Sequence, residues 1–235
     1  MTIYDLVPGG VPVVFPASVL AAGVLLVAGL HVRRKIEAGG VLPDEGITVR
    51  NVFEGLTEYL LSMADATMGH EGRKYLGIVC SIFFFILIAN LMGLVPLVGG
   101  ATSYVETALA WALISFVVYN YVGIKTHGWK YIYQFMGPAL FDLKIGDTKY
   151  HVRALTPLFL PLELLLHGAR VVTLTVRLLA NMFADHTVVG VWISMVPLAV
   201  PAIFMGLGTL VAFLQAFVFA LLTMIYIGSA LEEAH

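Results

Sequence analysis

Glu163-Leu-Leu-Leu-His167-Gly-Ala-Arg170-Val-Val-Thr-Leu-Thr-Val-Arg177-Leu-Leu-Ala-Asn181-Met-Phe-Ala-Asp185-His186 is an apolar run that polar residues interrupt at helical intervals. Six polar residues recur there at spacings of 4, 3, 7, 4 and 4: Glu163, His167, Arg170, Arg177, Asn181 and Asp185. At 100° per residue they fall within an arc of about 80°, which predicts one polar ribbon along a helix. The ribbon would be about 33 Å long, more than the thickness of a bilayer core. We expect it to face protein or water, because charged residues inside membranes usually mark ion paths.

Arg177 is the ribbon residue that packing explains least well. Its nearest acid on the same helix is Asp185, two turns away, and a guanidinium cannot be neutralised by losing its proton. The alternative is a packed helix whose charges pair locally, with Glu163 contacting His167 or Arg170. That alternative leaves Arg177 without a partner in its own helix, so a carboxylate of another chain would supply what is missing.

The composition of the chain is that of a membrane protein. Of its 235 residues, 60% are hydrophobic and 12% are charged, which is about half the charge of an ordinary soluble domain. Among its thirteen Lys and Arg residues, only Arg170 and Arg177 lie inside long apolar runs. A charge at the bilayer centre costs about 2.5 to 3.5 kcal/mol even on lenient insertion scales, so these two arginines require an explanation.

Apolar runs of membrane-spanning length divide the chain. Three have ordinary length, 11–32, 76–97 and 104–124, and two are longer, 154–190 and 199–231. A helix over the first long run would measure about 55 Å, so it must tilt strongly or lie partly along the membrane. We therefore predict an all-α integral membrane protein with about five membrane helices, the last two long and strongly tilted.

The basic residues predict the orientation. Clusters at 33–35, 73–74 and 125–153 share the cytoplasmic side by the positive-inside rule, which puts the N-terminus outside and the C-terminus in the cytoplasm. The first apolar run precedes its basic cluster, the reverse of a secretory signal peptide, so we expect a retained helix. The lack of a transit peptide favours a bacterial inner (plasma) membrane over an organelle membrane.

Four segments follow from these spans. They are 1–75, a membrane helix and a cytoplasmic-side amphipathic segment; 76–125, a two-helix hairpin; 126–153, a cytoplasmic loop; and 154–235, a tilted ion-translocating hairpin. Within the first, 48–71 mixes apolar and acidic residues as an interfacial helix does.

Other chemistries find little support. Gly206-Leu-Gly208 lacks the preceding strand and following Lys of a phosphate loop, and the single Cys80 excludes an internal disulfide. Zinc ligation by Glu163 and His167 is geometrically open but disfavoured, so we expect no metal, no cofactor and no catalytic residue. For Gln215, packing with a satisfied amide and a functional role both remain open.

Four motifs resemble one known family, the a subunit of F-type ATP synthases. The segment from Arg177 to His186 is similar to its Arg-Leu-x-Gly/Ala-Asn segment. The other motifs are Leu214-Gln215-Ala-Phe217 and Leu221-Leu-Thr-Met-Ile-Tyr226, which match its last helix, and Asn90-Leu-Met-Gly-Leu-Val-Pro96 with Ala101-Thr-Ser103, which match an earlier helix and outer loop. The resemblance covers about 76–235, whereas 1–75 match only in layout.

The resemblance implies a stator subunit whose two long helices curve against a rotating ring of c subunits. Arg177 would face the ring carboxylates and keep protons from passing directly between two offset half-channels. Asn181 and Gln215 would orient that site, Glu163 with His167 would lie in the cytoplasmic half-channel, and Tyr226 would belong to the proton path. Arg170 and Asn90 are expected to be structural polar residues. The implied partners are the c-ring, b-type peripheral stalk subunits, the rest of the complex and membrane lipid, with no nucleic acid.

Two positions depart from the family pattern. Many relatives place Glu nine residues after the essential Arg and His seven residues before the Gln, where this chain has His186 and Gly208. Our hypothesis is that Asp185 and His186 together serve the outer half-channel, since His titrates near neutral pH. The two side chains point about 100° apart on a helix, so they can serve different walls.

Two other functions compete with this one. An autonomous secondary transporter would predict inverted repeats of similar length, and a structural scaffold would not need a charged ribbon. Either way the chain is not an enzyme by itself. The transported ion, H⁺ or Na⁺, and the direction of the complex remain open, because the ion-binding carboxylate would belong to the ring.

Overall fold

The computed structural model describes residues 14–39, 48–95, 100–128, 141–145, 148–152, 156–195 and 199–231, together with positions 12, 46 and 98. Its α-helices are α1 (Val14–Gly39), α2 (Val49–Gly72), α3 (Leu76–Leu94), α4 (Val105–His127), α6 (Thr156–Met195) and α7 (Ala199–Leu231). Short 3-10 turns η2 (Arg73–Tyr75) and η3 (Ala101–Ser103) flank α3. The predicted all-α membrane fold is confirmed.

Four of the described helices, α1, α3, α4 and α7, are long and apolar enough to cross a bilayer. The helix α6 is not among them, although it is 40 residues long. Its polar residues lower its average hydropathy, and these are the residues of the ribbon. The helix that most needs an aqueous or protein neighbour is therefore the longest one described.

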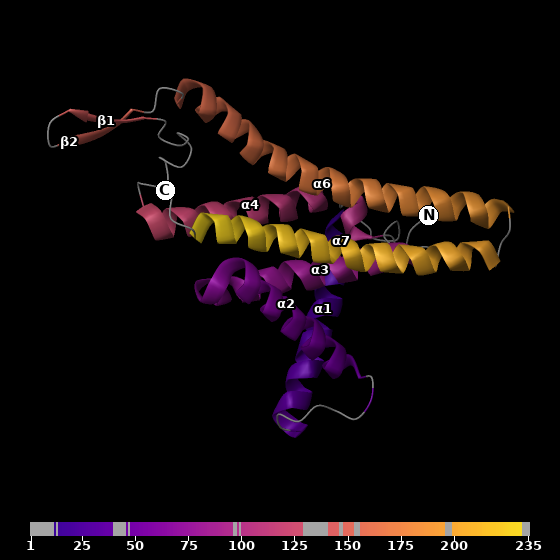
Figure 1. Cartoon of the computed structure of the whole chain (residues 1–235). Coiled ribbons are helices and arrows are strands. Elements are labelled where there is room, and N and C mark those ends of the chain that lie inside the picture. Colours follow the sequence, from indigo (N-terminus) through magenta and orange to yellow (C-terminus); the bar gives the residue numbers. More distant parts are fainter. Residues whose placement is uncertain are drawn as a thin grey trace.

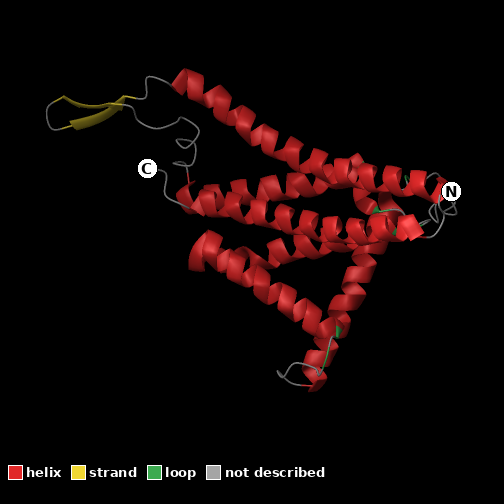
Figure 2. Cartoon of the chain, turned by 45° about the vertical axis from the view of Figure 1, so that its right-hand side comes forward, coloured by secondary structure: helices red, strands yellow, loops and turns green. Residues whose placement is uncertain are grey.

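The helices form a bundle with an arm (Figure 1). The bundle consists of α3, α4, α6 and α7, which run lengthwise beside one another, and α6 forms one edge of it in both views. The arm consists of α1 and α2, which leave the bundle at a steep angle (Figure 2). The helix α7 packs against α3, α4 and α6 of the bundle and also against α2 of the arm.

Local sequence signals define the ends of α2. The Thr48 hydroxyl accepts a hydrogen bond from the Asn51 backbone N–H over 3.3 Å, which caps the first turn. Near the other end Gly69 has a φ of 64° and interrupts the helical geometry. Only glycine adopts this conformation without strain, so Gly69 sets the kink before η2. Arg73 then donates two hydrogen bonds of 2.6 Å to Asp65 across that kink.

Small residues let α7 approach its neighbours closely. Gly208, Ala212, Ala216 and Ala220 are buried, as their four-residue spacing predicts, whereas Gly206 is exposed. Ala216 and Ala220, with Phe219 and other apolar residues, place α7 in the main hydrophobic core. The position of α7 is therefore closely constrained by packing, and α7 can serve as a fixed wall for α6.

The closest approach of α7 to α2 predicts a strong effect of one methyl group. A Cβ at Gly228 would lie 2.6 Å from the backbone carbonyl oxygen of Thr67, whereas a Cβ at Gly206 would meet nothing within 4 Å. We expect Gly228→Ala to lower the free energy of unfolding by about 1 to 3 kcal/mol, because a backbone atom must move. Gly206→Ala is the matched control and should leave it unchanged or slightly raised. Thermal unfolding of the purified subunit in detergent checks this, and equal midpoints for the two variants would contradict it.

The 126–153 segment holds an element that we did not predict. Strands β1 (Phe141–Ile145) and β2 (Thr148–Val152) pair antiparallel, with Phe141 opposite Val152 and Ile145 opposite Thr148. The sequence does contain a β-hairpin pattern, because apolar and polar residues alternate along 141–145 before the turn-forming Gly146-Asp147 pair. The rest of this predicted loop lies outside the described residues, apart from the end of α4 with Gly128.

Candidate functional site

The polar ribbon of α6 lies against α7. Arg170 stacks on Tyr226, Asn181 donates a hydrogen bond to Gln215, and the Asp185 carboxylate lies beside Gly208. Along these three contacts the residue numbers increase in α6 and decrease in α7. The two helices therefore run antiparallel along the ribbon. The five ribbon residues whose side chains are described are buried or half-buried: His167, Arg170, Arg177, Asn181 and Asp185. The side chain of Glu163 lies outside what is described.

Arg177 lies in the middle of this contact. Its side chain is half-buried, and no hydrogen bond or ion pair joins it to any other residue that the structure describes. Leu178 next to it is buried, while Val176 on its other side is 54% exposed. The guanidinium thus sits at the border between the core and an open apolar face. Within the described part of the chain no carboxylate neutralises it, as the spacing of acids along α6 predicted.

Asn181 and Gln215 form the shortest described link between the two long helices. The Asn181 amide Nδ2 donates to the Gln215 Oε1 over 2.7 Å. Gln215 is 5% exposed, and its own Nε2 is buried without a hydrogen-bond partner among the described residues. One end of the Gln215 amide is therefore satisfied, and the other remains available to donate. The functional role of Gln215 stays a prediction.

The link predicts energetic coupling between positions 181 and 215. Removing either partner leaves a buried polar group, which costs about 1 to 3 kcal/mol, whereas replacing both by Leu removes the need for a bond. We expect Asn181→Leu and Gln215→Leu together to cost about 1 kcal/mol less than the two single changes added. Thermal unfolding of the four proteins in a double-mutant cycle gives this value. Strict additivity would mean that the bond is absent in the folded protein.

Asp185 occupies the side of α6 that faces α7. A Cβ at Gly208 would lie 3.6 Å from the Asp185 Cγ and Oδ1, and closer still to the Leu94 side chain of α3. A side chain larger than glycine at position 208 would compete for the space beside the carboxylate.

His186 faces a different neighbour. Its Nε2 lies 3.3 Å from the Ser103 hydroxyl of η3, and its side chain is exposed. Together with Ser103, Val176, Leu179, Ala180 and Phe183 it lines a shallow pocket on the surface of α6. Asp185 and His186 therefore face different neighbours, as the 100° difference between adjacent helical residues predicted.

A buried network fixes η3 beside this end of α6. Asn90 of α3 accepts a 2.7 Å hydrogen bond from the Thr102 hydroxyl and donates to the Ala212 carbonyl oxygen of α7 at 3.5 Å. A Cβ at Gly100 would lie 2.9 Å from the Ala89 carbonyl oxygen, so glycine is needed for the close approach of η3 to α3. Asn90 is thus a structural polar residue in its contacts, and it positions Ser103 against His186.

The other end of the ribbon is a cluster of rings around a cation. The Arg170 guanidinium carbon lies 4.6 Å from the Tyr226 ring centroid and 5.8 Å from that of Tyr119 in α4. The ring of His167 lies 5.9 Å from that of Tyr119. Tyr119 was missed in the sequence analysis, because periodicity along α6 does not reveal a residue contributed by α4. Its only signal was a phenol within an apolar run.

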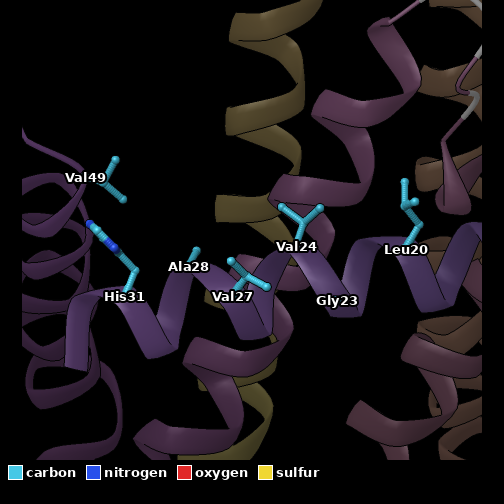
Figure 3. A pocket seen from close by; sticks show the side chains of 7 residues that line it. All are labelled: Leu20, Gly23, Val24, Val27, Ala28, His31 and Val49. Atoms are coloured by element: carbon cyan, nitrogen blue, oxygen red, sulfur yellow. The ribbon is translucent and has the colours of Figure 1, made fainter. Parts of the chain in front are cut away.

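The largest apolar groove described on the surface lies away from the ribbon. It follows α1 and is lined by Leu20, Gly23, Val24, Val27, Ala28, His31 and Val49 (Figure 3). His31 points toward Val49 at one end of the row of apolar side chains (Figure 3). Among the described residues no group of three or more His, Cys, Asp or Glu side chains could hold a metal ion.

The fold and the ribbon define an all-α integral membrane protein with a charged helix face packed inside it. A family model described as ATP synthase A chain matches residues 16–228, and the chain belongs to this family. The match begins well inside the 1–75 segment, so the family extends further toward the N-terminus than the motifs indicated.

Individual relatives agree with this assignment. The chain is 36% identical over 222 residues to ATP synthase subunit a of Bdellovibrio bacteriovorus, covering 93% of this chain and 90% of that protein. It is 37% identical over 220 residues to ATP synthase subunit a of Solibacter usitatus, with 93% and 89% covered. Identity reaches 40% over 187 residues with ATP synthase subunit a 1 of Syntrophotalea carbinolica, covering 80% and 74%. Family membership supports a proton-translocating stator role in an ATP synthase complex, and these relatives are bacterial.

Proposed function

We propose that this chain is the stator subunit that provides two proton half-channels to and from a c-ring, with Arg177 facing the ring carboxylates. The observation that carries the proposal is that no described residue pairs with Arg177, which lies at the border of an exposed apolar face. That face includes Val172, Val176 and Phe183 of α6 and Leu210 and Leu214 of α7, each at least 48% exposed. A ring of apolar helices that each bear one carboxylate would cover this face and pair the arginine.

The chemistry of Arg177 follows from its fixed charge. A cation within about 4–6 Å of a carboxylate favours the ionised form and releases its proton. Low-dielectric surroundings strengthen this effect. Because guanidinium keeps its own proton, it does not carry protons across the contact and so separates the two half-channels. The Asn181–Gln215 link one turn away would hold the local spacing of α6 and α7.

The two half-channels would lie at opposite ends of the ribbon. Glu163 and His167 would serve the cytoplasmic one, with Tyr226 on its α7 wall, while Asp185 and His186 would serve the outer one. The N-terminus would lie outside and the C-terminus in the cytoplasm, as the basic residues predict. The proposed location is a bacterial plasma membrane, with 154–235 as the ion-translocating hairpin and 126–153 on the cytoplasmic side.

The subunit would be non-catalytic by itself, with phosphoanhydride chemistry carried out by partner subunits. Its direct partners would be the c-ring on the α6–α7 face and b-type stalk subunits elsewhere. Affinity purification of the tagged chain from its native membrane tests this, and we expect the c-ring to co-purify in mild detergent. An autonomous transporter would purify without a ring and move a solute after reconstitution alone, and a scaffold would do neither.

A further inference from the structure

Tyr119 of α4 carries a buried hydroxyl that makes no close hydrogen bond to a described residue, although the side chains of Asn120 and Arg170 lie near enough to interact with it. The side chain is only 2% exposed, and its ring packs against those of Phe116, His167 and Tyr226. Leaving such a group unsatisfied carries a substantial free-energy cost, so buried polar groups in native proteins are bonded to protein or to ordered water. This hydroxyl therefore marks a place suited to a ligand of the size and polarity of water.

Other buried hydroxyls at the same helix contact are satisfied differently. Ser115, one turn before Tyr119 on α4, lies 2.9 Å from the Thr223 hydroxyl of α7. Thr223 also donates to the Phe219 carbonyl oxygen of its own helix. The α4–α7 contact thus pairs its other buried hydroxyls directly, which distinguishes Tyr119 from an ordinary packed residue.

The residues around Tyr119 offer polar partners for a water. An internal water needs two to four polar partners in a polar site. His167 is 8% exposed beside Tyr119, and the Arg170 guanidinium lies over the faces of the Tyr119 and Tyr226 rings. Cation–π contact uses the flat face of the guanidinium and leaves N–H donors at its edge. Side-chain donors of Asn120 and Arg170 therefore lie near the hydroxyl, and the His167 ring packs against the Tyr119 ring.

The cluster of Tyr119, His167, Arg170 and Tyr226 lies on the side of Arg177 where the cytoplasmic half-channel is proposed. His167 and Arg170 precede Arg177 by ten and seven residues, which is about 15 and 10 Å along the helix. We propose that Tyr119, with His167 and Tyr226, binds an ordered water that relays protons between the cytoplasmic entrance and Arg177, and that Arg170 positions the two tyrosines. This inference rests on the proposed function. In each step the water accepts one proton and releases another, so Tyr119 is not consumed and does not ionise.

The test is Tyr119→Phe in the assembled complex, which keeps the ring and removes only the hydroxyl. We expect ATP-driven proton pumping and gradient-driven flow per assembled complex to fall about fivefold, roughly the value of one hydrogen bond. We also expect the H₂O/D₂O rate ratio to rise, because proton relay then limits the rate. Ser115→Ala is the matched control, since it removes a buried hydroxyl one turn away, and it should leave rate and isotope ratio unchanged.

Wild-type behaviour of Tyr119→Phe, or equal losses in both variants, would overturn the inference. If the Tyr119→Phe complex does not assemble, a high-resolution density map of the wild-type complex tests the inference instead. Ordered water within about 3 Å of the Tyr119 hydroxyl oxygen supports the relay, and its absence there overturns it. The Arg177→Ala variant distinguishes failure of the proposed function from failure of the Tyr119 water relay. If that variant remains coupled, the proposed function fails, whereas uncoupling there with an unaffected Tyr119→Phe rejects only the relay.

Discussion

Arg177→Ala is expected to abolish coupled proton transport while the complex still assembles. Each ring carboxylate would then meet no fixed cation, and loss of such a neighbour shifts carboxylate proton affinity by about 10- to 1000-fold. We therefore expect ATP-driven pumping in membrane vesicles to fall at least tenfold. Without a charge that separates the half-channels, gradient-driven proton flow should also lose its dependence on ATP synthesis.

Two further variants sharpen this test. Arg177→Lys keeps a positive charge but replaces a flat, permanently protonated group by an ammonium that can lose its proton, so its transport should be intermediate. Arg34→Ala removes an exposed arginine of α1 that has no described role in the ribbon and should retain wild-type transport. Normal coupling in an assembled Arg177→Ala complex would mean that the ribbon is structural.

Asp185→Asn and His186→Ala are expected to have the next largest effect. A positioned acid or base contributes about 10²- to 10⁴-fold to a proton-transfer step, and solvent can replace part of that contribution at a half-exposed site. We expect each single change to slow proton pumping about tenfold. Because Asp185 and His186 are neighbours that interact electrostatically, the loss in the double variant should be smaller than the roughly hundredfold that simple addition gives.

Thr187→Ala is a suitable control for both substitutions. Thr187 is exposed on the next position of α6, and its hydroxyl donates to the Phe183 carbonyl oxygen of the same helix. Pumping at the wild-type rate in the single and double variants would reject the hypothesis that these residues serve the outer half-channel. A large loss in the Thr187→Ala control would instead indicate damage to the helix.

The helices were predictable because each contains a long apolar or amphipathic run. Their ends were less so. The first run was predicted to end at 32, where basic residues begin, but α1 continues to Gly39. Charged residues end an apolar run but can continue a helix. Here Arg33 pairs with Glu37, one helical turn later, over 2.8 Å. The β1–β2 hairpin was missed because Gly146-Asp147 was interpreted only as a loop signal.

The candidate site was predictable along one helix but not between helices. The 3.6-residue period placed His167, Arg177 and Asp185 on one ribbon. It could not specify which neighbour that ribbon would face, since this depends on how α7 packs. The resemblance named Asn181 and Gln215 without implying their 2.7 Å contact. Tyr119 was missed because it reaches the ribbon from α4. The roles of all these residues remain predictions.

Disulfide cross-linking tests most directly whether Arg177 faces the ring. Cys80 is the only cysteine, so a Cys80→Ala background is free of thiols. In it we would place a cysteine at Ala180 or Leu214, both exposed beside the Arg177 region, and one next to the ring carboxylate. The account predicts a cross-link from both positions under mild oxidation and none from Val24→Cys on α1. Equal cross-linking from Val24, or none from Ala180 and Leu214 in an assembled complex, would contradict it.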